Sequence, residues 1–218
     1  YIMCNKYEKR YTFTKEDFSL SAGDDRIHFL NTANSDCILI ESNGHFALVD
    51  SGEGNKNPRK KTAYHGFGED VIGYLKKAAA GKDGKVRLDF ILGTHCHYDH
   101  YGNFEEIINS DDIIIEKAYF KKYDVSGSTE LESEGWGNAE TYKKIIAALE
   151  KKNIPLIQDL PDEEFMFGDF TAKFINTVTP EELKGRGENS ASVGVKLKKG
   201  ERTAFLAADF TAASGLEV

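Results

Sequence analysis

Short apolar runs in the first quarter of the chain predict β-strands. Residues 37–41 and 46–50 are rich in aliphatic side chains, and Asn43-Gly44 lies between them. Asn-Gly between two apolar runs is a strong hairpin signal, because both residues tolerate the positive φ of a tight turn. A shorter, partly apolar run at residues 26–30 predicts one more strand before this hairpin.

Two later segments have the spacing of apolar positions that is typical of amphipathic helices. Between Glu69 and Gly81, apolar residues recur every three or four positions, and residues 139–152 repeat this pattern as the clearest helix of the chain. Asn103 is expected to cap a short helix that covers residues 104–108. The sequence therefore predicts helices between groups of strands.

The remaining apolar runs predict strands on both sides of these helices. Residues 124–137, which include the only tryptophan, are rich in serine, glycine and glutamate and predict a loop. Strands are mixed with helices along the chain, and hairpins lie on both sides of the helices. This arrangement indicates a layered α/β protein with mixed sheets. The runs expected to form the later strands are residues 88–93, 112–120, 165–174, 193–197 and 203–208.

The composition is that of an ordinary globular protein. The 218 residues are 40% hydrophobic and 29% charged, which suits a single domain over residues 1–218. The formal net charge of −8 argues against a nucleic-acid surface, so no nucleic-acid partner is expected. No apolar stretch reaches the length of a membrane span. Three widely spread cysteines give no disulfide framework, and strand alternation favours Cys96 on the face opposite its histidine neighbours.

The segment from Thr94 to His100 concentrates side chains that bind or orient metal ions. It holds three of the six histidines of the chain and directly follows the apolar run 88–93. His95 and His97 are two positions apart, so an extended backbone points both imidazoles to the same side. Asp99 and His100 follow and can face a second ion. Imidazole and carboxylate groups suit zinc, iron or manganese, and two adjacent ions suit hydrolysis; the alternative is a histidine-rich surface loop without metal.

The order of the motifs resembles that of the metallo-β-lactamase superfamily. Thr94-His95-Cys96-His97-Tyr98-Asp99-His100 resembles its T-H-x-H-x-D-H signature. Asp50-Ser51-Gly52 resembles its early D-x-G motif, and residues 205–209 resemble the late strand that ends in a metal-bridging aspartate. Residues 27–40 resemble the opening of one branch, which includes the hydrolase-like domain of bacterial competence proteins and the teichoic-acid phosphorylcholine esterase.

The resemblance implies an αββα sandwich of two mixed β-sheets flanked by helices, with two divalent metal ions. Zinc is the favoured metal, and manganese or iron is the alternative. Asp99 would also orient the bridging hydroxide and pass a proton to the leaving group, and Asp50 would hydrogen-bond a metal ligand. As lone residues, Asp50 and Asp209 would be turn or strand-end carboxylates. The residues that match the family's ligands are His95 and His97 for the first ion, Asp99 and His100 for the second, and Asp209 as the bridge.

Two departures from the family pattern concern the completeness of the site. Members usually supply a third histidine for the first ion before the bridging aspartate, whereas this chain has Glu188 and Asn189 near that position. Glu188 is either an oxygen ligand, which would favour manganese or iron, or a solvated loop residue. No histidine follows His100, and the sequence ends soon after Asp209, so we expect a C-terminally incomplete domain.

These features favour a metal-dependent hydrolase whose metal-bridging hydroxide attacks a phosphodiester or phosphorylcholine-like ester. Hydrolysis of an acyl substrate (a β-lactam, lactone or thioester) is the alternative, and a degenerate, non-catalytic ligand-binding domain is a third interpretation. The expected substrate is a small-molecule or cell-wall-derived ester, and a secreted or cell-surface location is favoured over a cytoplasmic one. An aromatic wall able to hold a quaternary ammonium is predicted from Tyr119, Phe120, Tyr123 and Trp136, with core packing as the alternative.

Overall fold

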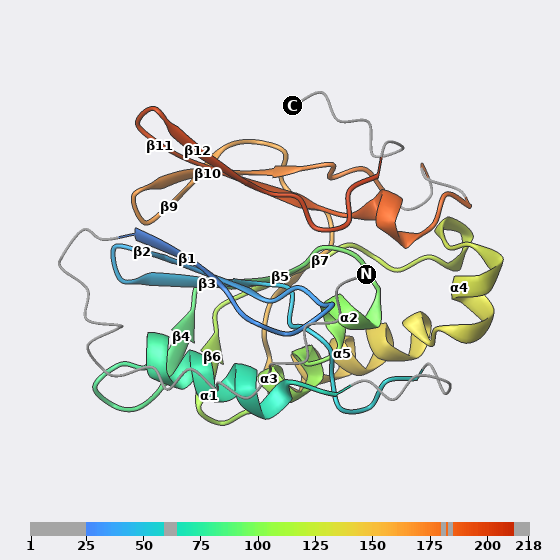
Figure 1. The fold of residues 1–218 in the computed structure, drawn as a ribbon, viewed down its shortest axis with the longest axis horizontal. Coiled ribbons are helices and arrows are strands. Elements are labelled where there is room, and N and C mark those ends of the chain that lie inside the picture. The colour runs from blue at the N-terminus through green and yellow to red at the C-terminus, as the bar shows by residue number, and fades with distance from the viewer. Residues whose placement is uncertain (1–24, 59–64, 180–181, 183–184, 212–218) are drawn as a thin grey trace, which may run out of the picture.

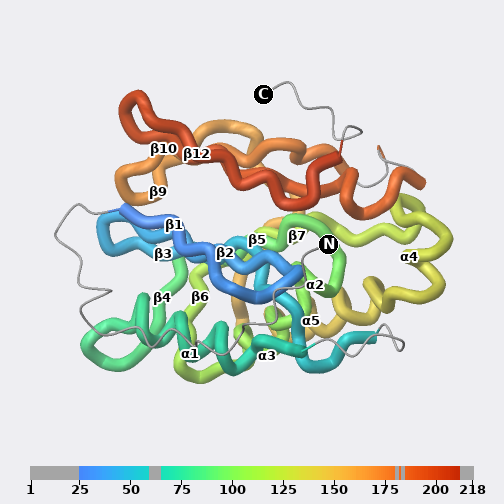
Figure 2. Tube along the Cα trace, in the orientation of Figure 1, coloured from blue at the N-terminus to red at the C-terminus, as the bar shows by residue number. Residues whose placement is uncertain are grey.

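The protein is a sandwich of two β-sheets with helices on one side. The computed structural model describes residues 25–58, 65–179, 182 and 185–211. The two sheets face each other, and helices cover the outer face of the larger sheet (Figure 1). The first strands of the chain lie in the larger sheet and the last strands in the smaller one (Figure 2). This layering confirms the expected α/β sandwich, although in the described part of the chain no helix covers the outer face of the smaller sheet.

The larger sheet is mixed, because an antiparallel meander is followed by parallel strands. The first three strands pair antiparallel, as the hairpin signal predicts, and the third pairs parallel with the strand that precedes the histidine motif. The remaining pairings are also parallel. In spatial order its strands are β1 (Asp25–Phe29), β2 (Ile38–Ser42), β3 (His45–Val49), β5 (Phe90–Gly93), β7 (Ala118–Phe120) and β8 (Leu156–Ile157).

The smaller sheet is antiparallel throughout: short hairpins join β9 to β10 and β11 to β12, and a longer connection that contains a 3-10 turn joins β10 to β11. Gly168 adopts a φ of +54° in the hairpin that divides the apolar run 165–174 into two strands, and glycine tolerates this conformation without strain. A separate pair of short parallel strands, β4 (Val86–Leu88) and β6 (Ile113–Ile115), lies beside the larger sheet. The strands of the smaller sheet are β12 (Arg202–Leu206), β11 (Gly194–Lys199), β10 (Phe170–Ile175) and β9 (Phe165–Phe167), in spatial order.

The helices lie mostly on the face of the larger sheet that points away from the smaller one (Figure 1). Both helices expected from apolar spacing are present, close to their predicted bounds. In the part of the chain that the structure describes, no helix combines the length and apolar character needed to cross a bilayer. The helices are α1 (Gly68–Ala79), α2 (Tyr98–Tyr101), α3 (Phe104–Asn109), α4 (Glu130–Gly135) and α5 (Asn138–Lys152), with 3-10 turns η2 (Val125–Gly127) and η4 (Glu188–Ala191).

The inner strands of the larger sheet are buried on both faces and so contribute to two cores. Leu39 packs into the cluster between this sheet and the helices, whereas Ile38 and Ile40 pack into the cluster between the two sheets. Successive side chains of a strand point to opposite faces, which explains why these runs are apolar without alternation. Burial of each such side chain contributes about 1.5–3 kcal/mol.

Two apolar runs predicted as single strands are each divided between two sheets. Residues 88–93 contain the end of β4 and all of β5, and residues 112–120 contain β6 and β7. Asp89 and Glu116 stand at the breaks, where a charged side chain is better placed near solvent than in a core. Periodicity alone does not reveal such a change of sheet, since both parts of each run are apolar.

Two local expectations were wrong. Residues 124–137 are not a continuous loop, because they contain η2 and α4. Asn103 precedes α3 but forms no side-chain cap; its amide nitrogen donates to the carbonyl oxygens of Ser51 (2.7 Å) and Glu53 (3.0 Å). The buried amide of Asn103 thus satisfies carbonyl groups that are distant in sequence, whereas local capping rules consider only neighbouring residues.

Lys121 links the ends of strands that belong to the two sheets. It follows β7, and its ammonium donates to the carbonyl oxygens of Asn176 (2.6 Å), after β10, and Ala191 (2.9 Å), at the end of η4. The side chain is buried, and this burial lowers the pKa of Lys121 to about 8, although nearby Glu188 acts in the opposite direction. The lysine therefore ties together the segments that lie behind the histidine motif.

We expect Gly93→Ala to destabilise the fold by about 1–3 kcal/mol, because overpacking a filled core forces neighbours to move. A Cβ at Gly93 would lie 2.4 Å from the ring of Tyr101 and 2.5 Å from that of Phe120. Gly73 in α1 is the matched control, since a Cβ there meets nothing within 4 Å. Gly73→Ala should stabilise by about 0.5–1 kcal/mol. Urea unfolding measures both, and equal effects would contradict this account.

The free energy of unfolding should depend on pH through Lys121. Its folded pKa of about 8 lies below the value of an unfolded lysine, about 10.4. Between these values the unfolded chain binds more protons, so the contribution of Lys121 to stability rises as the pH increases from about 8 to 10.4. Urea unfolding measures the free energy of unfolding of the wild type and of Lys121→Met. As the pH rises from about 8 to 10.4, the wild type should gain stability relative to the variant. A constant difference would contradict the lowered pKa.

Candidate metal centre

The histidine motif forms the connection between β5 and α2, at the carboxyl end of a parallel strand. Ligand sites in α/β proteins commonly lie at this end. Backbone hydrogen bonds from His97 N to His95 O (3.0 Å) and from Tyr101 N to His97 O (2.9 Å) fold the connection back on itself. His95, His97 and His100 are all buried, which excludes the alternative of a histidine-rich surface loop.

Three imidazoles and one carboxylate converge on a shared space. His95 Nε2 lies 3.0 Å from His97 Nδ1. The carboxylate of Asp209, which follows β12 in the other sheet, has its oxygens 3.9 Å from His95 Nε2 and 3.6 Å from His100 Nε2. Two ligands at 2.0–2.1 Å from one tetrahedral ion lie about 3.3 Å apart, so these separations are close to those of a metal site. His95, His100 and Asp209 form one group whose ligand atoms all lie within 4.8 Å of one another.

Asp50 fixes both ends of the histidine motif. Its carboxylate accepts hydrogen bonds from Thr94 N (2.9 Å) and Thr94 Oγ1 (2.7 Å) at the start of the motif, and it lies 2.7 Å from His100 Nδ1 at the end. Asp50 follows β3, which pairs with β5, and is fully buried at a φ of +56°. A buried carboxylate needs such partners, so Asp50 holds His100 with its Nε2 turned toward Asp209.

The other two histidines are also held through the nitrogen that faces away from the shared space. His97 Nε2 lies 2.7 Å from an oxygen of Glu132, and both side chains are buried. His95 Nδ1 lies 3.1 Å from Thr94 Oγ1 and 3.2 Å from Ser192 Oγ. Outer partners of this kind fix the tautomer and ring orientation of metal-binding histidines.

The charges around His100 favour a cation at the centre. Burial lowers the pKa of His100, but Asp50 and Asp209 outweigh it and raise the pKa well above its ordinary value. The contact with His100 in turn lowers the pKa of Asp209, against the effect of burial. A proton on His100 and a divalent ion at its Nε2 satisfy the same negative surroundings, so metal binding would displace that proton.

Asp36 belongs to the site, although sequence reasoning did not select it. It forms a second group with Asp50 and His100, whose ligand atoms lie within 4.8 Å of one another. Burial raises the pKa of Asp36, and the neighbouring carboxylates of Asp50, Asp209 and Asp99 add to this effect. Its only signal in the sequence is its position just before β2, in the stretch that resembles a family opening. Asp99 is half-buried at the start of α2 and joins neither three-ligand group among the described residues.

Glu188 and Asn189, which occupy the place of the missing histidine, differ in their surroundings. Glu188 is buried, so it is not a solvated loop residue. Its carboxylate accepts hydrogen bonds from Cys96 N (3.3 Å) and Ser128 Oγ (2.8 Å) and joins no three-ligand group in the described part of the chain. Asn189 Oδ1 is buried and has no hydrogen-bond partner among the described residues.

Helix α4 carries Glu132, a site residue that sequence reasoning missed, and it is followed by Trp136, which was expected only as part of an aromatic wall. Glu132 holds His97, and the ring of Trp136 packs edge-on against the ring of His97 with centroids 4.8 Å apart. The available signal was the capping-box pattern Thr129-x-x-Glu132, which is present with both of its hydrogen bonds. The high content of serine, glycine and glutamate masked it, because a short helix adds little apolar periodicity.

The expected aromatic wall is not formed as a unit. Phe120 and Tyr119 are buried in the two cores, and Tyr123 packs near Tyr142. Of the four, Trp136 is the one whose ring packs against a histidine of the motif in the part of the chain that the structure describes. Cys96 is buried and its thiol contacts the carbonyl oxygen of Asn138 (3.4 Å), in line with the expected opposite face.

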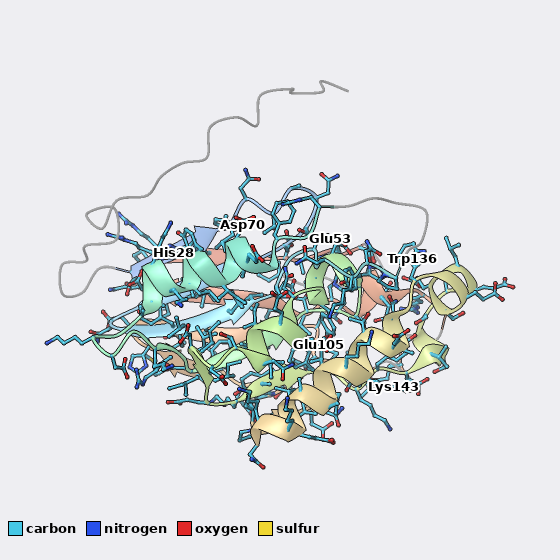
Figure 3. The ribbon with its side chains drawn as sticks, turned by 90° about the horizontal axis from the view of Figure 1, so that it is seen from below. His28, Glu53, Asp70, Glu105, Trp136 and Lys143 are labelled. Atoms are coloured by element: carbon cyan, nitrogen blue, oxygen red, sulfur yellow. The ribbon has the colours of Figure 1, made fainter. Side chains whose placement is uncertain are left out.

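A groove of about 1320 Å³ lies among the helices α2, α3, α4 and α5; Trp136 is part of its wall, whereas His97, His100 and Asp209 do not line it. Glu105 of α3 and Trp136 are both seen from the helical side of the molecule (Figure 3). Its charged lining residues are four glutamates and two lysines, and Lys144 pairs with Glu140 at 2.8 Å. The groove therefore carries an excess of negative charge. The charged residues are Lys56, Glu105, Glu106, Glu134, Glu140 and Lys144.

The donor set at the centre fits divalent metal ions. Imidazole nitrogens and carboxylate oxygens bind zinc, iron and manganese. The imidazole nitrogens that face outward have hydrogen-bond partners, as expected where a second set of residues orients metal ligands. Asn189 Oδ1, which has no hydrogen-bond partner among the described residues, is a further acceptor. It lies on the segment where the family pattern has one more ligand.

The comparison with solved structures finds similar folds at low sequence identity. The metallo-beta-lactamase fold protein YhfI from Bacillus subtilis is 18% identical, with a TM-score of 0.43, over 79% of this chain and 55% of that chain. A possible metal-dependent hydrolase from Veillonella parvula is 13% identical, with a TM-score of 0.46, over 89% and 66%. The dizinc quorum-quenching lactonase AidC is 14% identical, with a TM-score of 0.48, over 78% and 54%. The chain thus spans between 54% and 66% of the length of these proteins.

The comparison with family profiles identifies one family, while the comparison with curated proteins returns no match. The profile described as the metallo-beta-lactamase superfamily matches residues 30–187, from just after β1 to the residue before η4. This region includes Asp50 and the complete histidine motif. Because the match extends over well more than half of the chain, the protein belongs to the metallo-beta-lactamase superfamily.

Proposed function

We propose that the cluster of His95, His97, His100 and Asp209 binds two divalent ions, with zinc preferred, and hydrolyses a phosphodiester or phosphorylcholine-like ester. The observation that supports this most directly is the convergence of His95, His100 and Asp209 within 4.8 Å. These side chains come from two different sheets and are buried or half-buried. Bringing buried imidazoles and a carboxylate together is costly unless a proton or a metal ion joins them.

Each residue of the cluster has a proposed role. His95 and His97 would hold the first ion, His100 and Asp99 would hold the second, and Asp209 would contact both. Divalent ions bound there would lower the pKa of a coordinated water and polarise the ester oxygen, which hydrolysis near neutral pH requires. Asp99 would accept a proton and pass it to the leaving group; its negative charge raises the pKa of both His100 and Asp36.

The charge of the adjacent groove supports an ester that carries a cationic group. Trp136 lines the groove and packs against His97, so a substrate bound in the groove would lie one side chain away from the histidine motif. Excess carboxylates and an aromatic ring attract a quaternary ammonium through charge and cation–π contact. The same carboxylates would repel the carboxylate of a β-lactam, which makes acyl hydrolysis of such acids the weaker candidate.

Removing a proposed ligand should abolish hydrolysis. We expect His97→Ala to lower kcat/KM for bis-p-nitrophenyl phosphate at least about 100-fold in the zinc-loaded protein, because a first-ion ligand is lost. His45→Ala is the matched control, since His45 is exposed and pairs with Asp89 at the opposite end of β3. Turnover and bound metal are measured together. The proposal fails if the wild type binds metal without hydrolysing phosphodiesters, or if both variants are equally active.

Groove charge should set the preference for cationic substrates. We expect Glu134→Lys to raise the KM for p-nitrophenyl phosphorylcholine about 3- to 10-fold, the size of a weak exposed charge contact, and to leave bis-p-nitrophenyl phosphate unchanged. Glu134 lines the groove, whereas Glu150 is an exposed residue of α5 outside it, so Glu150→Lys is the control. Equal changes for both substrates, or for both variants, would contradict the groove as the binding place of the cation.

A further inference from the structure

In the part of the chain that the structure describes, the carboxylate of Glu132 makes the side-chain hydrogen bonds that tie helix α4 to other segments. The helix covers only six residues, Glu130–Gly135, and most of its side chains are exposed. Isolated helices shorter than about 12–15 residues are marginal in water, so this segment depends on its caps and contacts. Glu132 is the buried residue of the helix and is 6% exposed.

The two oxygens of Glu132 contact three separate segments. Oε2 accepts hydrogen bonds from Thr129 N (2.6 Å) and Thr129 Oγ1 (2.7 Å), which closes the capping box that starts the helix. Oε1 lies 2.7 Å from His97 Nε2 and accepts a hydrogen bond from Glu188 N (3.0 Å). One group thus joins the start of α4, the histidine motif and the turn η4.

The same helix forms part of the groove wall. Leu131, Glu134 and Gly135 line the groove, and Trp136, directly after the helix, packs against His97. Leu131 is 68% exposed, so burial of its side chain does not anchor the helix. The position of this wall therefore depends on the contact between Glu132 and His97, and the ring orientation of His97 depends on the helix.

We propose that Glu132 is a positioning residue that couples the metal centre to α4, so that ion binding at His97 and ordering of the groove wall strengthen each other. This inference rests on the proposed metal site. An ion on His97 Nδ1 makes the opposite ring N–H a stronger donor to Glu132, and a fixed Glu132 holds the ring ready for the ion. Because coupling between two equilibria is reciprocal, each must change the other by the same factor.

Two measurements on the purified chain test the coupling. Zn²⁺ affinity is measured against a competing chelator through the emission of Trp136, the only tryptophan of the sequence. Hydrogen exchange of residues 129–136 is measured with and without Zn²⁺. Glu132→Gln is compared with Glu130→Gln, because Glu130 lies on the same helix but is exposed. Circular dichroism and the exchange of β2 and β3 check that each variant is folded.

We expect Zn²⁺ to slow exchange of residues 129–136 in the wild type and in Glu130→Gln. In Glu132→Gln we expect Zn²⁺ affinity about 10–100-fold weaker, the usual cost of losing an outer partner of a metal ligand, and no protection of α4 by Zn²⁺. A Glu132→Gln variant that binds Zn²⁺ as tightly as the wild type would overturn the inference. So would equal protection of α4 by Zn²⁺ in both variants.

The proposed function can fail separately from this coupling. If the wild type bound no Zn²⁺, Mn²⁺ or Fe²⁺, the proposed function and the ion-dependent half of the coupling would both be overturned. Contact between His97 and α4 is tested without metal by comparing His97→Ala with His45→Ala. Faster exchange of residues 129–136 in His97→Ala alone would support the contact, and equal exchange would overturn it.

Discussion

The site depends first on one buried carboxylate, that of Asp50. It satisfies the backbone and hydroxyl of Thr94 and the ring of His100, so it fixes the motif at both ends. A carboxylate that is 1% exposed is strongly destabilising unless donors surround it, and this requirement forces the motif into a single shape. The pairing of β3 with β5 makes this possible, because it brings Asp50 beside the end of β5.

The centre forms where the ends of strands from the two sheets meet. The histidines come from the larger sheet, while Asp209, Glu188 and Ser192 come from segments that border the smaller one. A backbone hydrogen bond from Val193 N to Thr94 O (3.0 Å) joins these halves, and Lys121 reinforces the junction from β7. The packing of the two sheets therefore determines whether the ligands meet, and loss of that packing would separate them without any change in the motif.

Much of the fold could be predicted from the sequence, because its signals are local. The Asn43-Gly44 hairpin and the amphipathic segments of α1 and α5 follow directly from turn chemistry and apolar spacing. The division of residues 88–93 and 112–120 between sheets could not be predicted, since it depends on which strands pair in three dimensions. The short helix α4 was missed because its stability comes from the contact of Glu132 with His97, a residue 35 positions earlier in the chain.

The candidate site shows the same division between local and distant information. The histidine motif can be recognised from the sequence because its ligands are close together. The positions of Asp50 before it and Asp209 after it match the family pattern and so suggest which carboxylates join the site. Asp36 and Glu132 have no comparable signal, because aspartate and glutamate are common at strand ends and in helix caps. Their membership follows from distances that only the folded chain defines. The turned-away carboxylate of Glu188 likewise depends on a hydrogen bond with Cys96 N across the sheet junction.

The most direct test of this account is the location of zinc in the folded protein. Crystals of the zinc-loaded chain, measured with X-rays above and below the zinc absorption edge, would give the ion positions from anomalous differences. The account predicts ions in the space between His95, His97, His100 and Asp209, with Glu132 and Asp50 still bonded to the outer nitrogens of His97 and His100. Zinc found only at exposed histidines such as His45 and His65, with that space empty, would contradict it.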